Sequence, residues 1–533
     1  MHPCLSVDEI VRLIACELVA SERRATTVAL ACCCKIFEDP ALDALWETQD
    51  ELLPLLQSLP GDVWDGEENV GVPTTYVLSL LNTLIRKSFT RSPTPPEWTR
   101  FRKYARRMRM LSEDGDLETL SSEVFWVLQI CAANGPLFPN LRNVNILLAA
   151  EGFVPFIPLF LSPGIATISI EFDESDIFKV MVPSIVATFP TLCPNLRNIY
   201  LKSLPRNPTI TAAISGMLLA SNINVLRTLH VDSPLTEEAR EAIHNLPDLR
   251  DLSVVVERDT SLPPLVLPNL TNLLIECDRV DDWLGLFRGA TFGKLDAVTF
   301  RSGFEQNENF FEAFEKVALA ASIQNTLSKF HLYGSWPWNP NYSSLLPFTQ
   351  MTYLVVRIPC TDDCSSTVDD DVVTSLARTM PKLETLRLGN SPCGEIHAGV
   401  TVTGLVVLAH HCPNLSALCI HFQVDSLSVP PTTVGVASSA GTATLRRDCA
   451  LRDLDVGGIF IAEESILVVA MTLARIFPRI EYIFSGYRNW EKVMDAIRLS
   501  RQIVDCSSKE HYLSKIRSNF CDTSSGATLE GSS

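Results

Sequence analysis

From about residue 100 onward, one short pattern of apolar positions keeps returning along the chain. Each copy has three apolar residues: the second lies three residues after the first, and the third lies two residues after the second. Leu196, Ile199 and Leu201 are an example. The last two apolar positions are two residues apart, which indicates a strand with one buried face. The copies begin at Ala105, Leu141, Ile165, Leu196, Leu226, Leu249, Leu270, Leu295, Leu327, Met351, Leu383, Leu415, Leu451 and Ile480, spaced 21 to 36 residues apart.

Proline lead-ins and helical segments separate these strands. Phe138-Pro139-Asn140-Leu141 and Cys412-Pro413-Asn414-Leu415 are two of the lead-ins, where proline ends one helix and starts the turn into the next strand. Residues 310–322 and 372–379 have helical apolar spacing. The sequence therefore predicts an α/β leucine-rich-repeat solenoid, with parallel strands on the concave face, helices on the convex face, and a core formed by stacking.

The first fifty residues have a different pattern, that of three short helices. Ser6, with Glu9 three residues later, is a capping box and predicts a helix start directly after it. A second helix is expected over residues 25–37, and Asp39-Pro40 predicts the start of a third over 41–48. Helices this short bury little surface alone, so we expect this module to need a neighbour.

The apolar positions of this module resemble an F-box. The positions that carry the resemblance are Leu5, Glu9-Ile10, Ile14, Leu18, Leu30-Ala31, Cys34-Lys35-Ile36-Phe37, Leu42 and Leu45-Trp46. In F-box proteins this motif binds a Skp-type adaptor, which links it to a cullin and a RING subunit. More narrowly, the chain resembles the large family of F-box proteins with leucine-rich repeats found in mushroom-forming (basidiomycete) fungi. It departs from that family at Ser6, where a proline usually follows the first leucine.

The resemblance implies a non-enzymatic substrate-recognition subunit of an SCF-type E3 ubiquitin ligase. The repeats would then hold a protein substrate that the sequence does not name. The alternatives are a repeat scaffold without a ligase role, which Ser6 supports, and three helices that merely cap the solenoid. The residues that the resemblance assigns to adaptor binding are Leu5, Ile10, Ile14, Leu18, Leu30, Phe37, Leu45 and Trp46.

These patterns divide the chain into four expected parts. They are an F-box-like helical module over 1–50, a helical linker over 51–100, a solenoid of about 13–14 irregular repeats over 101–505, and a C-terminal tail over 506–533 that is largely disordered from 521. Residues 425–444 are rich in Ser, Pro, Thr, Gly and Ala, and we expect them to form a mobile insertion.

Charge narrows the classes of partner. The chain has 533 residues and a net charge of −18, which argues against general binding to nucleic acid or to anionic membranes. Residues 100–109 nevertheless include six basic residues. This stretch fits either a nucleic-acid patch or, as we expect, a helix face whose arginines contact acidic parts of the chain.

Cysteine usage and hydropathy indicate the compartment. The sixteen cysteines are scattered, and residues 1–4 do not begin a charged-then-apolar signal pattern, so we expect free thiols in a reducing environment. The most apolar run, 144–161, is interrupted by Glu151, Pro155 and Pro158 and does not predict a membrane span. The expected location is cytoplasmic or nuclear.

The sequence offers few candidates for chemistry. His410-His411-Cys412 with Cys419 and His421 is the densest set of metal-ligand residue types, but zinc sites use closely spaced ligand pairs that converge. Buried cysteines and histidines at a helix end explain this set better, so no metal or cofactor is expected. Neither a glycine-flanked nucleophile nor a phosphate-binding glycine loop is present in the sequence, and we expect no enzyme.

One feature of the repeats is a candidate partner site. Trp336-Pro337-Trp338 follows the strand copy that begins at Leu327, where a loop would leave the strand. Trp336 and Trp338 could form a binding hot spot. They could equally fold back over the edge of the repeats.

Overall fold

The computed structural model describes residues 7–64, 87–114, 120–133, 135–149, 152–172, 178–220, 223–256, 265–277, 280–287, 289–302, 310–334, 341–357, 368–389, 399–428 and 449–505. Leu5, Ser6, Trp336, Trp338 and the expected tail over 506–533 lie outside these ranges. The chain forms two compact units. Unit 1 is Met1–Glu276 with Ala290–Gly293, and unit 2 is Cys277–Gly289 with Lys294–Ser533.

Unit 1 alternates strands with helices. Its strands are β1 (Thr48–Gln49), β2 (Met110–Asp114), β3 (Asn143–Ala149), β4 (Thr167–Phe172), β5 (Asn198–Lys202), β6 (Thr228–Pro234), β7 (Asp251–Val256) and β8 (Asn272–Cys277). Its helices are α1 (Asp8–Ala20), α2 (Arg24–Cys33), α3 (Lys35–Glu47), α4 (Leu53–Leu56), η2 (Gly61–Val63), α5 (Pro95–Ala105), α6 (Ser122–Ala132), η6 (Val154–Phe160), α7 (Phe178–Leu192), α8 (Pro208–Leu218) and α9 (Glu237–His244). Strands β1 to β7 pair in sequence order, all parallel.

Unit 2 continues the same alternation. Its strands are β9 (Ala297–Ser302), β10 (Lys329–Gly334), β11 (Tyr353–Arg357), β12 (Thr385–Leu388), β13 (Ala417–Cys419), β14 (Asp453–Gly457) and β15 (Tyr482–Ser485). Its helices are α10 (Val280–Phe287), α11 (Phe310–Ala320), η7 (Ile323–Asn325), η8 (Tyr342–Leu345), α12 (Asp370–Thr379), α13 (Val402–His411), η10 (Val424–Ser428), η12 (Glu463–Ser465), α14 (Ile466–Ile476) and α15 (Asn489–Asp505). Strands β9 to β15 also pair in parallel and in sequence order.

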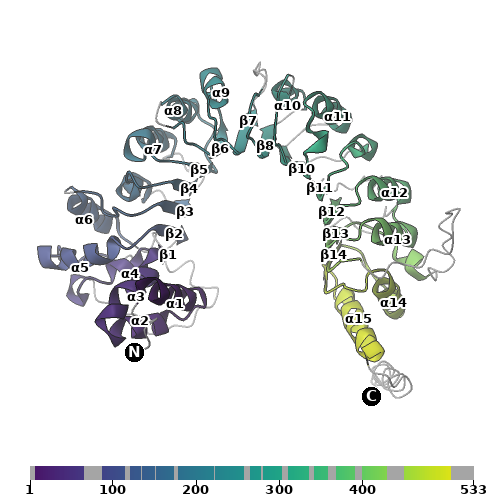
Figure 1. Cartoon of the computed structure of the whole chain (residues 1–533), viewed down its shortest axis with the longest axis horizontal. Helices are drawn as coiled ribbons and strands as arrows, with labels where there is room; N and C mark the ends of the chain where they lie inside the picture. The colour runs from purple at the N-terminus through teal and green to yellow at the C-terminus, as the bar shows by residue number, and fades with distance from the viewer. Residues whose placement is uncertain are drawn as a thin grey trace, which may run out of the picture. The chain divides into compact units, whose positions relative to one another are not determined.

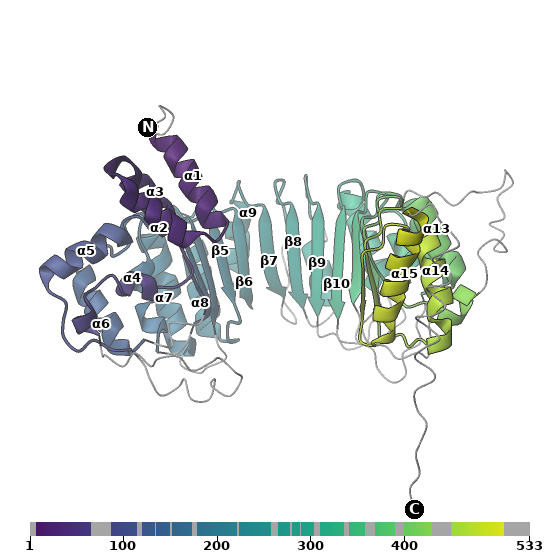
Figure 2. The same ribbon diagram turned by 90° about the horizontal axis from the view of Figure 1, so that it is seen from below.

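The repeat pattern produces this layering because its apolar positions all point to one side. Ile199 and Leu201 of β5, like Leu354 and Val356 of β11, are fully buried. In each unit the helices lie along that face of the strands and leave the opposite face, which we call the open face, uncovered (Figures 1 and 2). The expectation of an α/β leucine-rich-repeat fold is therefore confirmed.

The asparagines of three proline lead-ins, Asn140, Asn195 and Asn269, connect their repeats to the preceding ones. The side-chain amide of Asn140 donates to Arg106 O at 2.6 Å. The amides of Asn195 and Asn269 donate in the same way to carbonyl oxygens of the preceding repeat, at 2.9 Å in both cases. These bonds satisfy backbone acceptors at the turns, where neither helix nor strand provides a donor.

The first repeat copy is displaced from its expected position. Leu111 pairs with Val144, and Glu113 pairs with Ile146, so the copy begins at Met108 rather than at Ala105. The third inward position is held by Glu113, which is 1% exposed. A charged residue in place of the third apolar residue conceals the pattern and explains the error of three residues.

The third helix of the first fifty residues is also longer than expected. It begins at Lys35, after Cys34 adopts an extended conformation, and it continues through Pro40. Asp39-Pro40 is therefore not its start. Pro40 and Ala41 are buried, so packing of this segment compensates for the backbone hydrogen bond that proline cannot make.

The beginning of the low-complexity segment is packed in the structure. Residues 425–428 belong to η10, and Leu427 within it is fully buried. The hydroxyl of Thr472 donates to Leu427 O at 3.0 Å. The insertion that we expected over 425–444 therefore has its first turn anchored on α14, and residues 429–448 lie outside the described ranges.

Candidate functional site

Three helices, α1 to α3, form a small bundle at the start of unit 1. Its core consists of Ala15, Ala41 and Ala44, which are at most 5% exposed. Cys16, Leu30 and Ala31 pack against this core and are partly buried. Because the core residues are small, larger apolar side chains of the same helices are left on the surface.

The most exposed of these apolar side chains, Leu13, lies on helix α1. Val11 and Ala15, four residues apart, face inward. Val7, Leu13 and Ile14 face solvent, and Leu13 is 70% exposed. We call Val7, Leu13 and Ile14 the α1 strip. A strip of large apolar residues on a short module is typical of a docking surface.

The structure separates the expected adaptor-binding residues by exposure. Ile14 belongs to the α1 strip, whereas Phe37 is buried in the bundle. Leu5 lies outside the described residues. Ile10, Leu18, Leu30, Leu45 and Trp46 are half-buried. Leu13 was not predicted, because a helical spacing of three and then four residues, counted from Val7, selects Ile10 and Ile14 and not Leu13.

Trp46 at the end of α3 contacts the repeats. Its indole stacks on the ring of Tyr104 in α5, with 4.9 Å between ring centroids and 22° between ring planes. Stacking at this distance contributes about 0.5–1.5 kcal/mol beyond the area that it buries. Trp46 therefore joins the bundle to the array, and it is not part of the exposed strip.

Ion pairs reinforce the same contact. The guanidinium of Arg107 is hydrogen-bonded to the carboxylates of Asp39 and Asp43 on α3, and its side chain is only 13% exposed. Burial lowers the pKa of Arg107, but these two carboxylates raise it by more, so the net shift is upward. Lys103 pairs with Glu38 at 3.2 Å. The expectation that arginines of residues 100–109 contact acidic parts of the chain is confirmed.

The start of α5 is fixed by its own polar network. Thr94 and Glu97 form a capping box, in which Glu97 accepts from Thr94 N at 2.6 Å. Arg91 donates to Glu97 at 2.8 and 3.0 Å and to Asp62 at 2.7 and 3.0 Å. The hydrogen bond from Arg91, with that from Thr94, lowers the pKa of Glu97 to about 2.

The bundle also contributes a strand to the sheet. Directly after α3, β1 pairs in parallel with β2 through Thr48 and Gln49. The expected boundary between the helical module and the linker, at residue 50, thus follows a strand that already belongs to the repeat sheet. Next to it, Glu113 Oε2 accepts from Leu52 N at 2.8 Å in a buried contact. The α1–α3 bundle is therefore held to the first repeat by a strand, a ring stack and several ion pairs.

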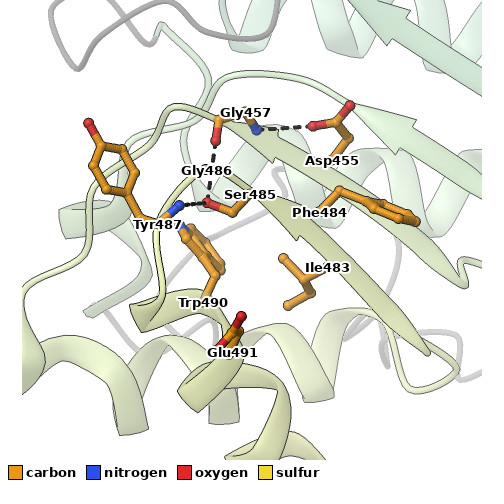
Figure 3. Close-up of a pocket in the computed structure, with 9 residues that line it drawn as sticks. All are labelled: Asp455, Gly457, Ile483, Phe484, Ser485, Gly486, Tyr487, Trp490 and Glu491. Atoms are coloured by element: carbon orange, nitrogen blue, oxygen red, sulfur yellow. Dashed lines mark hydrogen bonds between the residues drawn. The ribbon is translucent and has the colours of Figure 1, made fainter. Parts of the chain in front are cut away.

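A pocket of about 410 Å³ lies at the C-terminal end of unit 2, between β14, β15 and α15 (Figure 3). The hydroxyl of Ser485 donates to Gly457 O at 3.3 Å and accepts from Tyr487 N at 3.0 Å. Asp455 accepts from Gly457 N at 3.0 Å. No histidine lines the pocket, and the side chains of Ser485 and Asp455 are hydrogen-bonded to backbone groups.

Of the five candidate metal ligands, only Cys412 and Cys419 are buried. Burial raises the pKa of Cys412 and of Cys419 to about 12, which disfavours the thiolate that a metal requires. Cys412 Sγ donates instead to Ala377 O and Met380 O, at 3.8 and 3.7 Å. Within the described ranges, the structure has no group of three or more metal-ligand side chains placed to hold an ion.

No protein-family model and no curated protein matches the chain. Among solved structures, the chain is similar to an internalin from Listeria monocytogenes, with 10% identity, 73% of this chain and 79% of that chain covered, and a TM-score of 0.25. It is similar to a chain of the Rad7 and Elc1 complex in yeast, with 15% identity, 74% of this chain and 92% of that chain covered, and a TM-score of 0.36. For the LRIM1/APL1C complex the identity is 10%, the coverages are 78% and 71%, and the TM-score is 0.22.

These likenesses are too distant to carry a function to this chain. The fold rests instead on the strand register and on the buried inward positions described above. In the part of the chain that the structure describes, none of the helices combines the length and the apolar character needed to cross a membrane.

Proposed function

We propose that the chain is the substrate-recognition subunit of an SCF-type ubiquitin ligase, of the F-box and leucine-rich-repeat family of mushroom-forming fungi. The α1–α3 bundle would bind a Skp-type adaptor, and through it the cullin and RING subunits. The observation that carries the proposal is the α1 strip, where Val7, Leu13 and Ile14 are exposed on a bundle whose inner face is already packed. This role places the chain in the cytoplasm or the nucleus.

The attachment of the bundle to the first repeat supports this role. A substrate receptor catalyses nothing itself and acts by raising the local concentration of substrate near the ubiquitin-loaded enzyme. That effect depends on a fixed distance between the adaptor and the repeats. The pairing of β1 with β2 and the ion pairs of Arg107 restrict motion between the bundle and the first repeat.

A second candidate is a repeat scaffold that binds proteins without a ligase. In that case the α1 strip would contact another protein or none. Ser6 in place of the usual proline favours this candidate. Adaptor binding separates the two candidates, because only the ligase subunit requires it.

The test is co-elution of the full chain with a fungal Skp-type adaptor in size-exclusion chromatography. We expect a one-to-one complex, and we expect Leu13→Asp/Ile14→Asp to abolish it. The matched control is Leu467→Asp/Val468→Asp on α14, which changes an adjacent apolar pair of comparable exposure, 51% and 41%. The control variant should still bind the adaptor.

Absence of a complex with the folded wild-type chain would favour the scaffold, and Ser6→Pro would then be the next variant. Retention of the complex by Leu13→Asp/Ile14→Asp would show that the adaptor docks elsewhere. Circular dichroism of each variant establishes that the repeats are folded.

A further inference from the structure

The open face of unit 2 has an unusual charge. Its residues alternate with the buried inward positions, and the register of the strands places them side by side. These open-face positions are Ala297, Thr299 and Arg301 on β9, Lys329, His331 and Tyr333 on β10, Tyr353, Val355 and Arg357 on β11, and Thr385 and Arg387 on β12.

Each of these four consecutive strands contributes one cation, namely Arg301, Lys329, Arg357 and Arg387, and none of the open-face positions listed for them is acidic. The chain as a whole has a net charge of −18. Four cations on one strand face of an acidic chain are a local reversal of the sign of charge, and we call them the basic row. In the strand register, Arg301 and Arg357 are level with each other, whereas Arg387 and Lys329 lie nearer the starts of their strands.

The arginines of the basic row are available to a ligand. Lys329 lies 3.8 Å from Asp296 and is partly neutralised. For Arg301, Arg357 and Arg387, the described residues supply neither an ion pair nor a hydrogen bond. Arg301 and Arg357 are exposed, and Arg387 is half-buried. Charges that no carboxylate of the described residues neutralises can attract an anionic partner.

Aromatic side chains lie beside these arginines. The guanidinium of Arg357 sits over the Tyr333 ring, 5.9 Å from its centroid. His331 stacks between Tyr333 and Tyr353, with centroid distances of 6.2 Å to each. Burial lowers the pKa of His331, so the charge of the surface comes from lysine and arginine. Rigid rings beside arginines are the composition typical of protein-binding hot spots.

We propose that the basic row binds a short acidic segment of a partner protein, in extended conformation across strands β9 to β12. This inference rests on the proposed function, because it names the class of substrate that the repeats would select. Neighbouring strands are about 4.8 Å apart, so the four strands span roughly 14 Å. Alternate side chains of an extended peptide are about 6.6 Å apart, so about three acidic residues fit the span.

The distribution of charge favours carboxylates over other anions. A single phosphate group is bound best by arginines that converge on one point, whereas these arginines are spread over four strands. Two strands further on, β14 presents Asp453 and Asp455 on the same face. These carboxylates and the acidic chain would repel a long polyanion such as a nucleic acid, but they would leave room for a short acidic peptide.

The test measures fluorescence anisotropy of a labelled peptide of about ten residues that alternates glutamate with alanine, long enough to span the four strands. The full chain should bind it, and should bind the glutamine–alanine counterpart far more weakly. Arg357→Glu/Arg387→Glu should weaken binding by about tenfold or more. The matched control is Arg378→Glu/Arg475→Glu, which makes the same change of charge at exposed residues of α12 and α14 and should bind as the wild type does.

Several outcomes would overturn the proposal. They are no binding by the wild type, equal loss in the control variant, or tighter binding of a phosphoserine peptide or of an oligothymidylate than of the glutamate peptide. Arg357→Ala/Arg387→Ala, with its melting curve, distinguishes loss of charge from misfolding. Adaptor co-elution of the same variants is expected to be unchanged, so failure of the basic row and failure of the ligase role are separate results.

Discussion

The indole of Trp46 stacks on the ring of Tyr104, with 4.9 Å between their centroids. The first residue lies at the end of α3, and the second lies in α5, the helix that precedes β2. Resemblance to an F-box assigned Trp46 to the adaptor surface, whereas its contact here is internal. The role of Trp46 in adaptor binding is thus expected to be indirect, through the position of the bundle.

Removal of the Trp46 ring should weaken unit 1. We expect Trp46→Ala to lower the free energy of unfolding by about 2 kcal/mol, because a half-buried ring and its stacking partner lose contact. Chemical denaturation of Trp46→Ala, Tyr104→Ala and the double variant measures the coupling between the rings. A coupling energy near zero would contradict the stacking.

Arg107 should contribute more to stability than ordinary surface pairs do. Arg107→Met removes hydrogen bonds to Asp39 and Asp43 from a site that is 13% exposed, and we expect a loss of about 1–2 kcal/mol. The control is Arg498→Met, whose pair with Asp495 is 56% and 70% exposed and should change stability by less than about 0.5 kcal/mol. Equal effects in urea unfolding would show that the bundle is not held by Arg107.

Glu113 should tolerate an amide better than a truncation. Glu113→Gln keeps an oxygen that can accept the hydrogen bond from Leu52 N, so we expect a loss below about 1 kcal/mol. Glu113→Ala leaves a cavity and an unpaired buried N–H, and should cost about 2–3 kcal/mol. Thermal and urea unfolding of the two variants compare these costs. A larger loss for the amide than for alanine would contradict the assigned hydrogen bond.

Two half-buried histidines should make unit 2 sensitive to mild acid. Burial lowers the pKa of His331 and of His421 below the usual 6.5. As the pH falls below 6.5, the unfolded chain takes up protons that the folded chain does not, so stability is lost in this window and is unaffected above it. The loss is at most about 1.4 kcal/mol for each unit of pKa difference.

Urea unfolding between about pH 7.5 and pH 5.5 brackets the ordinary histidine pKa and measures this loss. His331→Gln/His421→Gln should flatten the dependence, since glutamine does not titrate. An unchanged slope in the variant would assign the acid sensitivity to other groups.

The sequence predicted the strands best where burial alone determines the residue type. Leu354 and Val356 face the helices and accept only apolar side chains, so their spacing identifies β11 directly. β1 was missed because Thr48 and Gln49 are too few and too polar to produce a pattern. The register of β2 was missed because Glu113 is buried through a hydrogen bond with Leu52, a partner far away in the sequence.

The candidate surfaces were predicted only in part, for a similar reason. Apolar spacing identified the three helices, but it does not show which apolar face is already packed against alanines and which is free. Leu13 is therefore exposed although the apolar spacing does not select it, and Phe37 is buried although the resemblance assigns it to adaptor binding. The basic row can be read from the sequence once the strands are known, because Lys329 and Arg387 lie between apolar positions of their strand copies and Arg357 directly follows one.

The pairing of β1 with β2 has a consequence for how this chain can be dissected. A parallel sheet whose first strand is uncovered presents unpaired backbone groups to other chains and tends to aggregate, and repeat arrays need a terminal element that prevents this. Here the same fifty residues that carry the α1 strip also shield that edge. Removal of residues 1–50 would therefore remove both this shield and the proposed adaptor-binding surface. Only substitutions on the outer surface of α1 can separate them.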